Sequence, residues 1–304
     1  MRIGISWAEP RSGSLDDLTA SLQRAADDGF RSAWMADIFG LDALSAVALA
    51  GARVPGIEVG TAVTPTYLRH PVALARQAIT TDLATGGRFA LGIGLSHQVV
   101  IEGMLHLSFD KPAQHMREYL AVLLPLLRDG RVSVRGETIG ADAGIGIRPV
   151  GPLPVLLAAM APRMLHLAGA VADGTILWMT GPRTIADHVV PRLREAAEEA
   201  GRPEPRVVCV LPICVTDDEG AARARAAKVF AVYDTLPSYK AMLDKEGAAG
   251  PGDVAIVGDE AAVREQVEAL AAIGVSDFVA GEFGAGDDAG RTRSLLRELA
   301  AGPA

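Results

Sequence analysis

The chain has 304 residues, of which 49% are apolar, 22% charged and only 5% aromatic, and its formal net charge is -8 with a pI near 5.3. This composition is typical of a folded, soluble protein with a large core of alanine, valine, leucine and isoleucine. An acidic chain is a poor partner for nucleic acid or for an anionic membrane, because both select clustered lysine and arginine, so we expect a small-molecule ligand.

The first residues, RIGIS, already resemble a core strand, and no basic segment with a cleavage site precedes a long apolar run. No apolar stretch reaches the ~20 residues that span a bilayer. We therefore expect a cytoplasmic protein. Cys209 and Cys214 lie in one apolar run at odd spacing, so on a regular strand they face opposite sides and cannot pair.

In chain order, short apolar runs alternate with amphipathic stretches, the pattern of a parallel sheet with connecting helices. The predicted strands are Arg2–Trp7, Ser32–Ala36, Ile57–Val63, Phe89–Gly94, Val155–Ala159, Gly174–Trp178, Val207–Val215 and Asp277–Ala280. The predicted helices are Leu15–Asp28, Ala43–Arg53, Val72–Thr85, Ala113–Arg128, Arg163–Val171, Thr184–Ala200, Glu219–Val232 and Glu260–Ile273. Most of these helices are followed by glycine, a common helix stop.

This regular cycle predicts a single (β/α)8 TIM barrel over the whole chain, with a doubly wound open sheet as the alternative. Two connections are longer than a plain turn. The segment of about 97–153 holds a helix and a glycine-rich stretch that suggests an irregular hairpin, and a loop insertion occupies about 245–260. Long insertions in compact domains are often lids over a site, and surface elaboration is the other interpretation.

In such a barrel the substrate binds where the strands end at their carboxyl side, which selects a short set of candidate residues. Asp37 stands alone after the second strand and is a candidate ligand contact, although it could instead cap the next helix, for which Asp42 is better placed. His97 closes "LGIGLSHQ", in which Gly92 and Gly94 allow close backbone approach; a purely structural histidine is the alternative.

Two predicted helices begin with a proline after small residues, in "AAMAPRML" and "WMTGPRT". Free N–H groups and the positive end of the helix dipole make such a start a candidate phosphate site, with Arg163 as an added cation; ordinary capping is the alternative. Trp7 and Trp178 end their strands and could line a substrate pocket or seal the upper layer of the barrel. No motif supports a hydrolase, and no histidine spacing supports a metal site.

Taken together, "GISW", the "AD" after the second strand, "GTAVTPTYLRHPVALARQAITTDLATGGRFALGIG" and "PVLLAAMAPRMLHLAGAVADGTILWMTGP" resemble the bacterial luciferase-like superfamily. More narrowly, they resemble its coenzyme F420-dependent oxidoreductases. The resemblance covers roughly residues 1–280. It implies a non-prolyl cis peptide and a bulge at the end of the third strand, here at Ala62–Val63 or one peptide to either side, which would explain why an apolar strand breaks at that point.

The resemblance also implies roles for individual residues. Asp37 would touch the cofactor near its ring or ribityl chain, Ala62 and Val63 would lie against the ring, and Thr61 would bond its polar edge. The remaining implied contacts are Leu95, Ser96 and His97 in the crevice after the fourth strand, and Ala159, Met160, Ala161, Arg163 and Gly181 around the cofactor phosphate. The helix of residues 113–128 and the glycine-rich segment would cover the substrate, and the chain would pair as a homodimer.

Two departures from the F420-dependent sugar-phosphate dehydrogenases of this family redirect the expected chemistry. Ile38 stands where those enzymes carry a histidine, and His97 stands where they carry a glutamate. We therefore expect hydride transfer from reduced F420 to a C=C, C=N or C=O bond, with His97 as a proton donor. The alternatives are an FMN-dependent monooxygenase supplied by a separate reductase, and a cofactor-free binding subunit.

Overall fold

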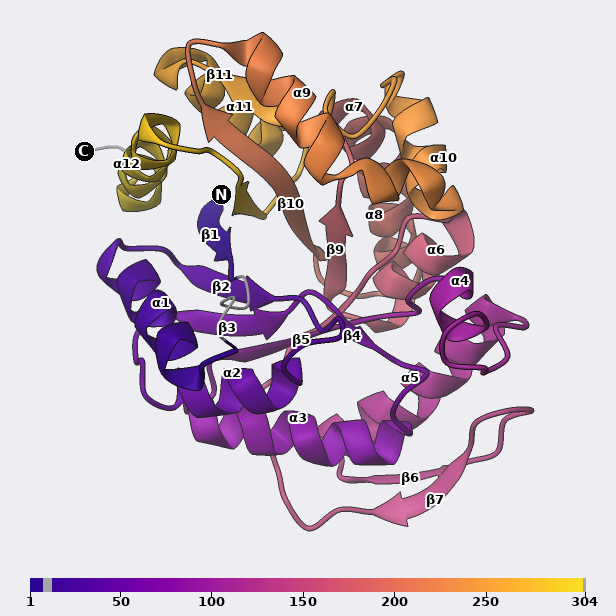
Figure 1. Cartoon of the computed structure of the whole chain (residues 1–304). Coiled ribbons are helices and arrows are strands. Elements are labelled where there is room, and N and C mark those ends of the chain that lie inside the picture. The colour runs from indigo at the N-terminus through magenta and orange to yellow at the C-terminus, as the bar shows by residue number, and fades with distance from the viewer. Residues whose placement is uncertain (8–12, 303–304) are drawn as a thin grey trace.

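The computed structural model describes residues 1–7 and 13–302. Within these residues the main sheet has ten strands, and eight parallel strands of it form a closed barrel (Figure 1). In spatial order they are β1 (Arg2–Ser6), β2 (Ser32–Met35), β3 (Glu58–Thr61), β5 (Phe89–Gly94), β8 (Val155–Leu157), β9 (Gly174–Trp178), β10 (Arg206–Val215) and β12 (Asp277–Glu282). Because β12 pairs with both β10 and β1, the sheet closes. The predicted TIM barrel is confirmed, and the open sheet is wrong.

Helices surround the barrel, most of them where the sequence predicts them. They are α1 (Leu15–Asp27), α2 (Ala43–Gly51), α3 (Pro71–Thr85), α5 (Pro112–Arg128), α6 (Pro162–Val171), α8 (Val190–Glu199), α11 (Glu260–Ala272) and α12 (Asp287–Ala301). Several begin at a side-chain cap: Ser14, Asp42, Asp218 and Asp259 each accept a hydrogen bond from the N–H three residues on. No described helix is long and apolar enough to cross a membrane.

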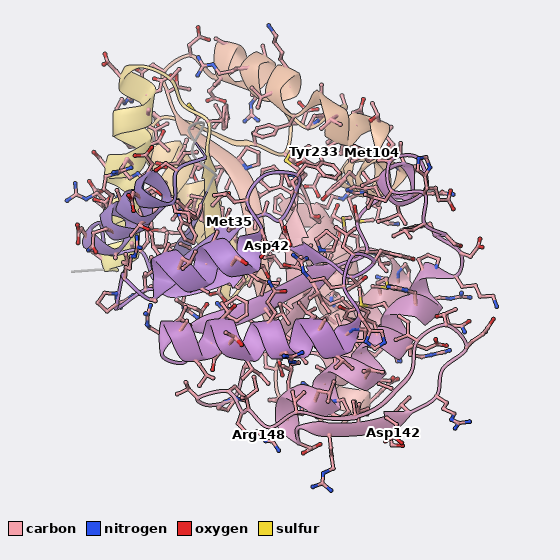
Figure 2. The ribbon with its side chains drawn as sticks, turned by 60° about the horizontal axis from the view of Figure 1, so that its bottom comes forward. Met35, Asp42, Met104, Asp142, Arg148 and Tyr233 are labelled. Atoms are coloured by element: carbon pink, nitrogen blue, oxygen red, sulfur yellow. The ribbon has the colours of Figure 1, made fainter. Side chains whose placement is uncertain are left out.

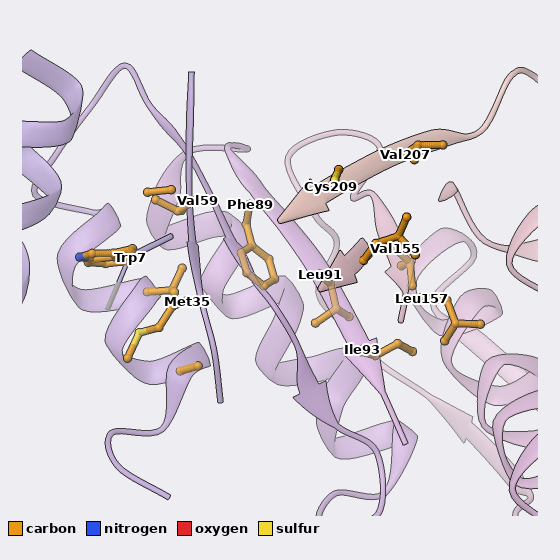
Figure 3. Close-up of a cluster of buried hydrophobic side chains, with 14 of the residues drawn as sticks. Trp7, Met35, Val59, Phe89, Leu91, Ile93, Val155, Leu157, Val207 and Cys209 are labelled. Atoms are coloured by element: carbon orange, nitrogen blue, oxygen red, sulfur yellow. The ribbon is translucent and has the colours of Figure 1, made fainter. Parts of the chain in front are cut away.

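The strands bury both faces, and their side chains alternate between two separate cores. Met35, Phe89, Leu91 and Val155 point outward and pack against the helices (Figure 3). The inward set fills the barrel: Trp34, Ala90, Leu156, Ile176, Val208, Val210 and Val279. Cys209 and Cys214 are buried free thiols that belong to different clusters, as their spacing predicts.

The amino-terminal end of the barrel is closed by a charged plug beneath Trp34. The Arg206 guanidinium donates to Asp277 at 2.7 and 2.9 Å and to Glu58 at 2.6 Å, and it lies 5.3 Å from the Trp34 ring. Gly60 leaves the space that the Trp34 ring occupies, since a Cβ there would lie 2.5 Å from two ring carbons. This end is therefore filled, and any internal site must lie at the other end.

Two irregular regions leave the barrel at opposite ends. Strands β6 (Arg131–Val134) and β7 (Ala141–Gly144) form the predicted hairpin, which lies along α5. Between β10 and β11 (Ile256–Gly258), the chain forms α9 (Glu219–Val229), the 3-10 helix η2 (Ala231–Thr235) and α10 (Pro237–Glu246). Figure 1 shows the hairpin below α3, α9 at the top of the view, and α10 at the upper right on the same side as α4 (Gln98–Ile101).

Several elements were not predicted. They are α4, η2, α10, the final helix α12 and the short strands β4 (Thr64–Pro65) and β11. The sixth predicted helix is also divided, into α7 (Pro182–Thr184), a π-helical turn η1 (Ile185–Val189) and α8. Pro191 accounts for the turn, because a proline in the first turn of α8 has no N–H to continue regular helical bonding.

Candidate active site

A cavity of about 660 Å³ opens at the carboxyl end of the barrel. Its size is within the range typical of small-molecule sites. Its floor comes from Trp34, Ala62, Val63, Ala158, Ile176 and Val210, and its walls include Ser6, Asp37, Ser96, His97, Ala159, Met160, Trp178, Tyr233, Leu236 and Tyr239. Figure 2 places Tyr233 and Met104, both lining residues, at the opposite side of the molecule from Asp142 and Arg148 beside the hairpin.

The broken third strand forms part of the cavity floor. The Ala62–Val63 peptide is cis, as predicted, and pairing resumes at Thr64, which lies opposite Ile93. The predicted close approach at Gly92 and Gly94 is to this bulge: a Cβ at Gly92 would overlap the Thr61 carbonyl, and one at Gly94 would lie 2.7 Å from the Val63 side chain. The glycines thus make room for the bulge.

Thr61 differs from its predicted role. Its hydroxyl donates to the Gly92 carbonyl at 2.8 Å and accepts from the Gly92 N–H at 3.0 Å. The side chain is fully buried and does not line the cavity. Thr61 therefore fastens β3 to β5 beneath the bulge, and the polar edge of a bound ring must find another partner.

Asp37 lines the cavity at the end of β2 and is held from behind by a cation. Arg69 lies 3.2 Å from one Asp37 oxygen and also pairs with Asp42. As predicted, Asp42 is the cap of α2, while Asp37 makes only a long contact of 3.5 Å with the Ala43 N–H. Burial raises the pKa of the Asp37 carboxyl, and Arg69 opposes that shift.

His97 and Ser96 line the cavity after β5, and Ser96 adopts a positive φ of 61°. The His97 imidazole faces the Tyr239 ring, with centroids 5.5 Å apart, and it makes no capping bond to α4. Burial lowers its pKa from the ordinary value, so the neutral imidazole is favoured. Leu95 departs from its predicted place, because its side chain packs against the outer core instead of the cavity.

Only part of the predicted phosphate-binding region, residues 159–163, lies at the edge of the cavity. Ala159 and Met160 line it, whereas Ala161 and Arg163 are exposed outside it at the start of α6. Ala161 provides no side-chain cap, so α6 keeps an uncapped amino terminus beside the cavity. His188 contacts the Met160 carbonyl at 2.8 Å and holds this loop from below.

Gly181 is not available as predicted, because a carboxylate of the protein already binds there. Glu246, at the end of α10, accepts from the Arg183 N–H at 3.1 Å and from the Thr184 N–H at 2.7 Å. Gly181 is needed for this contact, since a Cβ there would overlap the carboxyl carbon of Glu246. The first turn of this helix therefore anchors α10, and it offers no open phosphate site.

The two tryptophans have different places. Trp178 lines the cavity, but Trp7 packs between β1 and α1, where its indole N–H donates to the Ser21 hydroxyl at 2.8 Å. The alternation of β1 explains this: Ile3 and Ile5 point outward, so Trp7 follows them, whereas Trp178 follows the inward Ile176. Trp7 is thus not a pocket residue. The alternation of side chains along β1, which places Trp7 on the same face as Ile3 and Ile5, was the signal in the sequence.

The cover over the cavity also differs from the prediction. Helix α5 is the barrel's own fourth helix and packs beside α3, and the hairpin reaches neither the cavity nor its rim. The cover comes instead from Val99, Val100, Ile101, Met104 and Leu105 in and after α4, and from Val232, Tyr233, Leu236 and Tyr239 of η2 and α10. The sequence did not predict Val232, Tyr233, Leu236 and Tyr239 as cavity residues. The available signal was that the stretch "VYDTLPSY" holds four large apolar or aromatic side chains.

The sequence of this chain is similar to one protein family and to several named oxidoreductases. The sequence profile described as luciferase-like monooxygenase matches residues 4–277. A protein of Mycobacterium tuberculosis, provisionally named a coenzyme F420-dependent oxidoreductase, is 30% identical over 77% of this chain and 71% of its own length. The 5,10-methylenetetrahydromethanopterin reductase of Methanopyrus kandleri is 26% identical over 84% of this chain and 86% of its own.

Among solved structures, the coenzyme F420-dependent tetrahydromethanopterin reductase from Methanopyrus kandleri superposes with a TM-score of 0.81 at 22% identity. The match covers 98% of this chain and 97% of that one. At this identity the likeness establishes the shared barrel fold, and the residues of the cavity are interpreted from their own chemistry.

Proposed function

The chain belongs to the luciferase-like monooxygenase family, and from this premise we propose that it is a coenzyme F420-dependent oxidoreductase. It transfers a hydride between the deazaflavin and a C=O, C=N or C=C bond of a small organic molecule. The observation that carries the proposal is the interruption of the third strand between Thr61 and Thr64, which places Ala62 and Val63 on the floor of an apolar cavity of about 660 Å³.

The residues present suit a flat ring with an anionic tail. Ala62 and Val63 would lie under the ring, while Asp37 and Ser96 offer polar contacts beside it. At the cavity edge, the uncapped start of α6 and the exposed Arg163 suit a phosphate group. When bound, the coenzyme supplies or accepts the hydride.

The chain's own part is to orient the substrate, exclude water and manage one proton. The neutral His97 imidazole can donate a hydrogen bond from its ring N–H to a substrate oxygen, which polarises a carbonyl. In the reverse direction its unprotonated ring nitrogen accepts the hydroxyl proton of an alcohol. Because burial lowers its pKa, the imidazole is mostly unprotonated and available as a base, whereas few molecules hold the proton that an acid would donate, which refines the proton donor expected from sequence.

Sugar-phosphate oxidation is not proposed. Ile38 lines the cavity where a histidine would be needed, and His97 replaces the required glutamate. An FMN-dependent monooxygenase on the same barrel is the second candidate, because the same floor could support a flavin ring. A deazaflavin does not activate oxygen, so the cofactor decides between the two.

A fluorescence titration with oxidised F420, run in parallel with FMN, tests the proposal. We expect micromolar or tighter binding of F420 and at least tenfold weaker binding of FMN, about 1.4 kcal/mol. Ala62→Leu should weaken F420 binding by filling the floor, whereas Ala269→Leu, on the exposed face of α11, should not. Preference for FMN would establish the second candidate, and binding of neither would contradict both.

A further inference from the structure

Aromatic rings form a continuous band along one side of the cavity. Phe230 lies edge-on to Trp178 with centroids 5.6 Å apart, and Tyr233 lies edge-on to the same indole at 5.7 Å. Tyr233 then contacts Tyr239 at 4.9 Å, and Tyr239 faces His97 at 5.5 Å. The band thus connects the end of β9 with the candidate proton-transfer residue and presents ring faces and edges to anything bound beside it.

The mouth of the cavity is rimmed by large apolar side chains. Each is 48% to 67% exposed, and each also lines the cavity: Ile38, Phe39, Leu68, Val99, Met104 and Val232. They come from four different segments, the loops after β2 and β4, the region of α4, and η2. Clustered exposed apolar side chains at a cavity mouth mark a ligand-binding surface more often than an ordinary solvated one.

The charges of the lining point in the same direction. Among the described lining residues there is no lysine or arginine, and the carboxylate is Asp37, which already pairs with Arg69. An anionic substrate would be buried beside this carboxylate, and no described lining residue carries a positive charge that could compensate it. The lining therefore disfavours a phosphorylated or carboxylated substrate.

The aromatic band is held in place by the anchor of α10. Glu246 accepts two hydrogen bonds from the first turn of the helix that begins at Pro182, and the Thr184 hydroxyl donates to the Met242 carbonyl at 3.3 Å. Both contacts join α10 to the loop that follows Trp178. The rings of residues 230–239 are thereby preorganised, which lowers the entropic cost of binding a flat molecule.

We infer that the substrate is an uncharged molecule with a flat, largely apolar body, and that residues 230–239 recognise it. Its reducible group lies toward His97, and its body lies along the aromatic band toward the apolar rim. This inference rests on the proposed function for the reaction. It adds the substrate class and assigns specificity to a segment remote in sequence from the cofactor contacts.

A pair of nearly isosteric ligands tests it by calorimetry: acetylnaphthalene, a neutral ketone, and naphthoate, its carboxylate counterpart. Each is titrated into the chain saturated with oxidised F420 and into the chain alone. We expect the ketone to bind at least about tenfold more tightly than the carboxylate. Tyr233→Ala should weaken ketone binding, and so should Val232→Asp, a rim substitution at an exposed site that leaves the core intact. Leu83→Ala, on the outer face of α3, is the matched control.

Equal or tighter binding of naphthoate would overturn the inference, as would no binding of either ligand or unchanged ketone affinity in both cover variants. If F420 fails to bind while the ketone preference and the variant effects persist in the chain alone, the proposed function fails and the substrate class stands. If F420 binds and the ketone preference is absent, the inferred substrate class fails and the proposed function stands.

Discussion

The hairpin of β6 and β7 and the cover segment, residues 230–246, are both additions to the barrel, and each is fastened by one glutamate. Glu118 accepts from the N–H groups of Glu137, Thr138 and Ile139 at 2.9 to 3.1 Å. Glu246 accepts from two N–H groups in the first turn of the preceding barrel helix, which begins at Pro182. Only the second addition reaches the cavity, because the hairpin lies along α5 and contributes no lining residue.

We expect the largest difference between the two regions from alanine substitutions at one glycine in each, Gly92 at the cavity floor and Gly146 beyond the hairpin. Gly92→Ala places a Cβ into the Thr61 carbonyl, so we expect loss of at least about 2 kcal/mol of stability and loss of F420 binding. Gly146→Ala, beyond the hairpin, meets no atom within 4 Å and should change neither. Chemical denaturation and the F420 titration measure both quantities. A stable Gly92→Ala variant that binds F420 normally would contradict the account of the floor.

Removal of the hairpin anchor should affect stability alone. Glu118→Ala leaves three backbone donors without their charged acceptor, and we expect a loss of about 3 kcal/mol in the free energy of unfolding. At a temperature where the variant is folded, its F420 affinity should equal that of the parent chain. A large change in that affinity would show that the hairpin is coupled to the cavity.

Low pH should act on the same anchor. The Gln114 side-chain amide, together with the backbone N–H groups of the hairpin, holds the pKa of the Glu118 carboxyl well below its ordinary value. A depressed native pKa contributes stability that is present above the unfolded pKa, near 4.3, and is lost as the pH falls toward the native pKa. We therefore expect the difference in the free energy of unfolding between the parent chain and Glu118→Gln to shrink as the pH falls from 7 to 3. A difference that stays constant over this range would contradict this.

His97 should give a large effect on turnover with little effect on stability. With naphthylethanol as hydride donor and oxidised F420 as acceptor, we expect His97→Ala to lower kcat by about 10²-fold or more. In the parent chain, the rate should fall as pH drops through the lowered His97 pKa, on the acid side of 6.5. His166→Ala, at an exposed position on α6, is the control. Normal turnover in His97→Ala would remove His97 from the mechanism.

The anchor of the cover segment should give the smallest and most selective effect. Glu246→Ala leaves the exposed Arg183 N–H and the part-buried Thr184 N–H without their acceptor, so we expect a stability loss of about 1 kcal/mol. The ketone affinity should fall about fivefold, because the aromatic band loses its support. Calorimetry with acetylnaphthalene measures this, and an unchanged affinity would place the support of the band elsewhere.

The sequence predicted the barrel well because its strands are buried on both faces and read as continuous apolar runs, and Ala62–Val63 was found through the motif around it. The predictions from sequence were wrong where contacts between residues far apart in the chain determine the surroundings of a side chain. The environment of Gly181 depends on Glu246, 65 positions away in the chain, and the Thr61 hydroxyl bonds the backbone of Gly92, 31 positions away. The cover segment was missed because its helix is short and weakly amphipathic, so its apolar residues become a wall only once α10 is docked.

The most direct test of the account is a crystal structure of the chain with oxidised F420 and acetylnaphthalene. The account predicts the deazaflavin ring on the Ala62–Val63 floor, its phosphate near the start of α6, and the naphthalene between that ring and the rings of Tyr233 and Tyr239. A deazaflavin bound outside this cavity, or a ligand that lies away from residues 230–239, would contradict it.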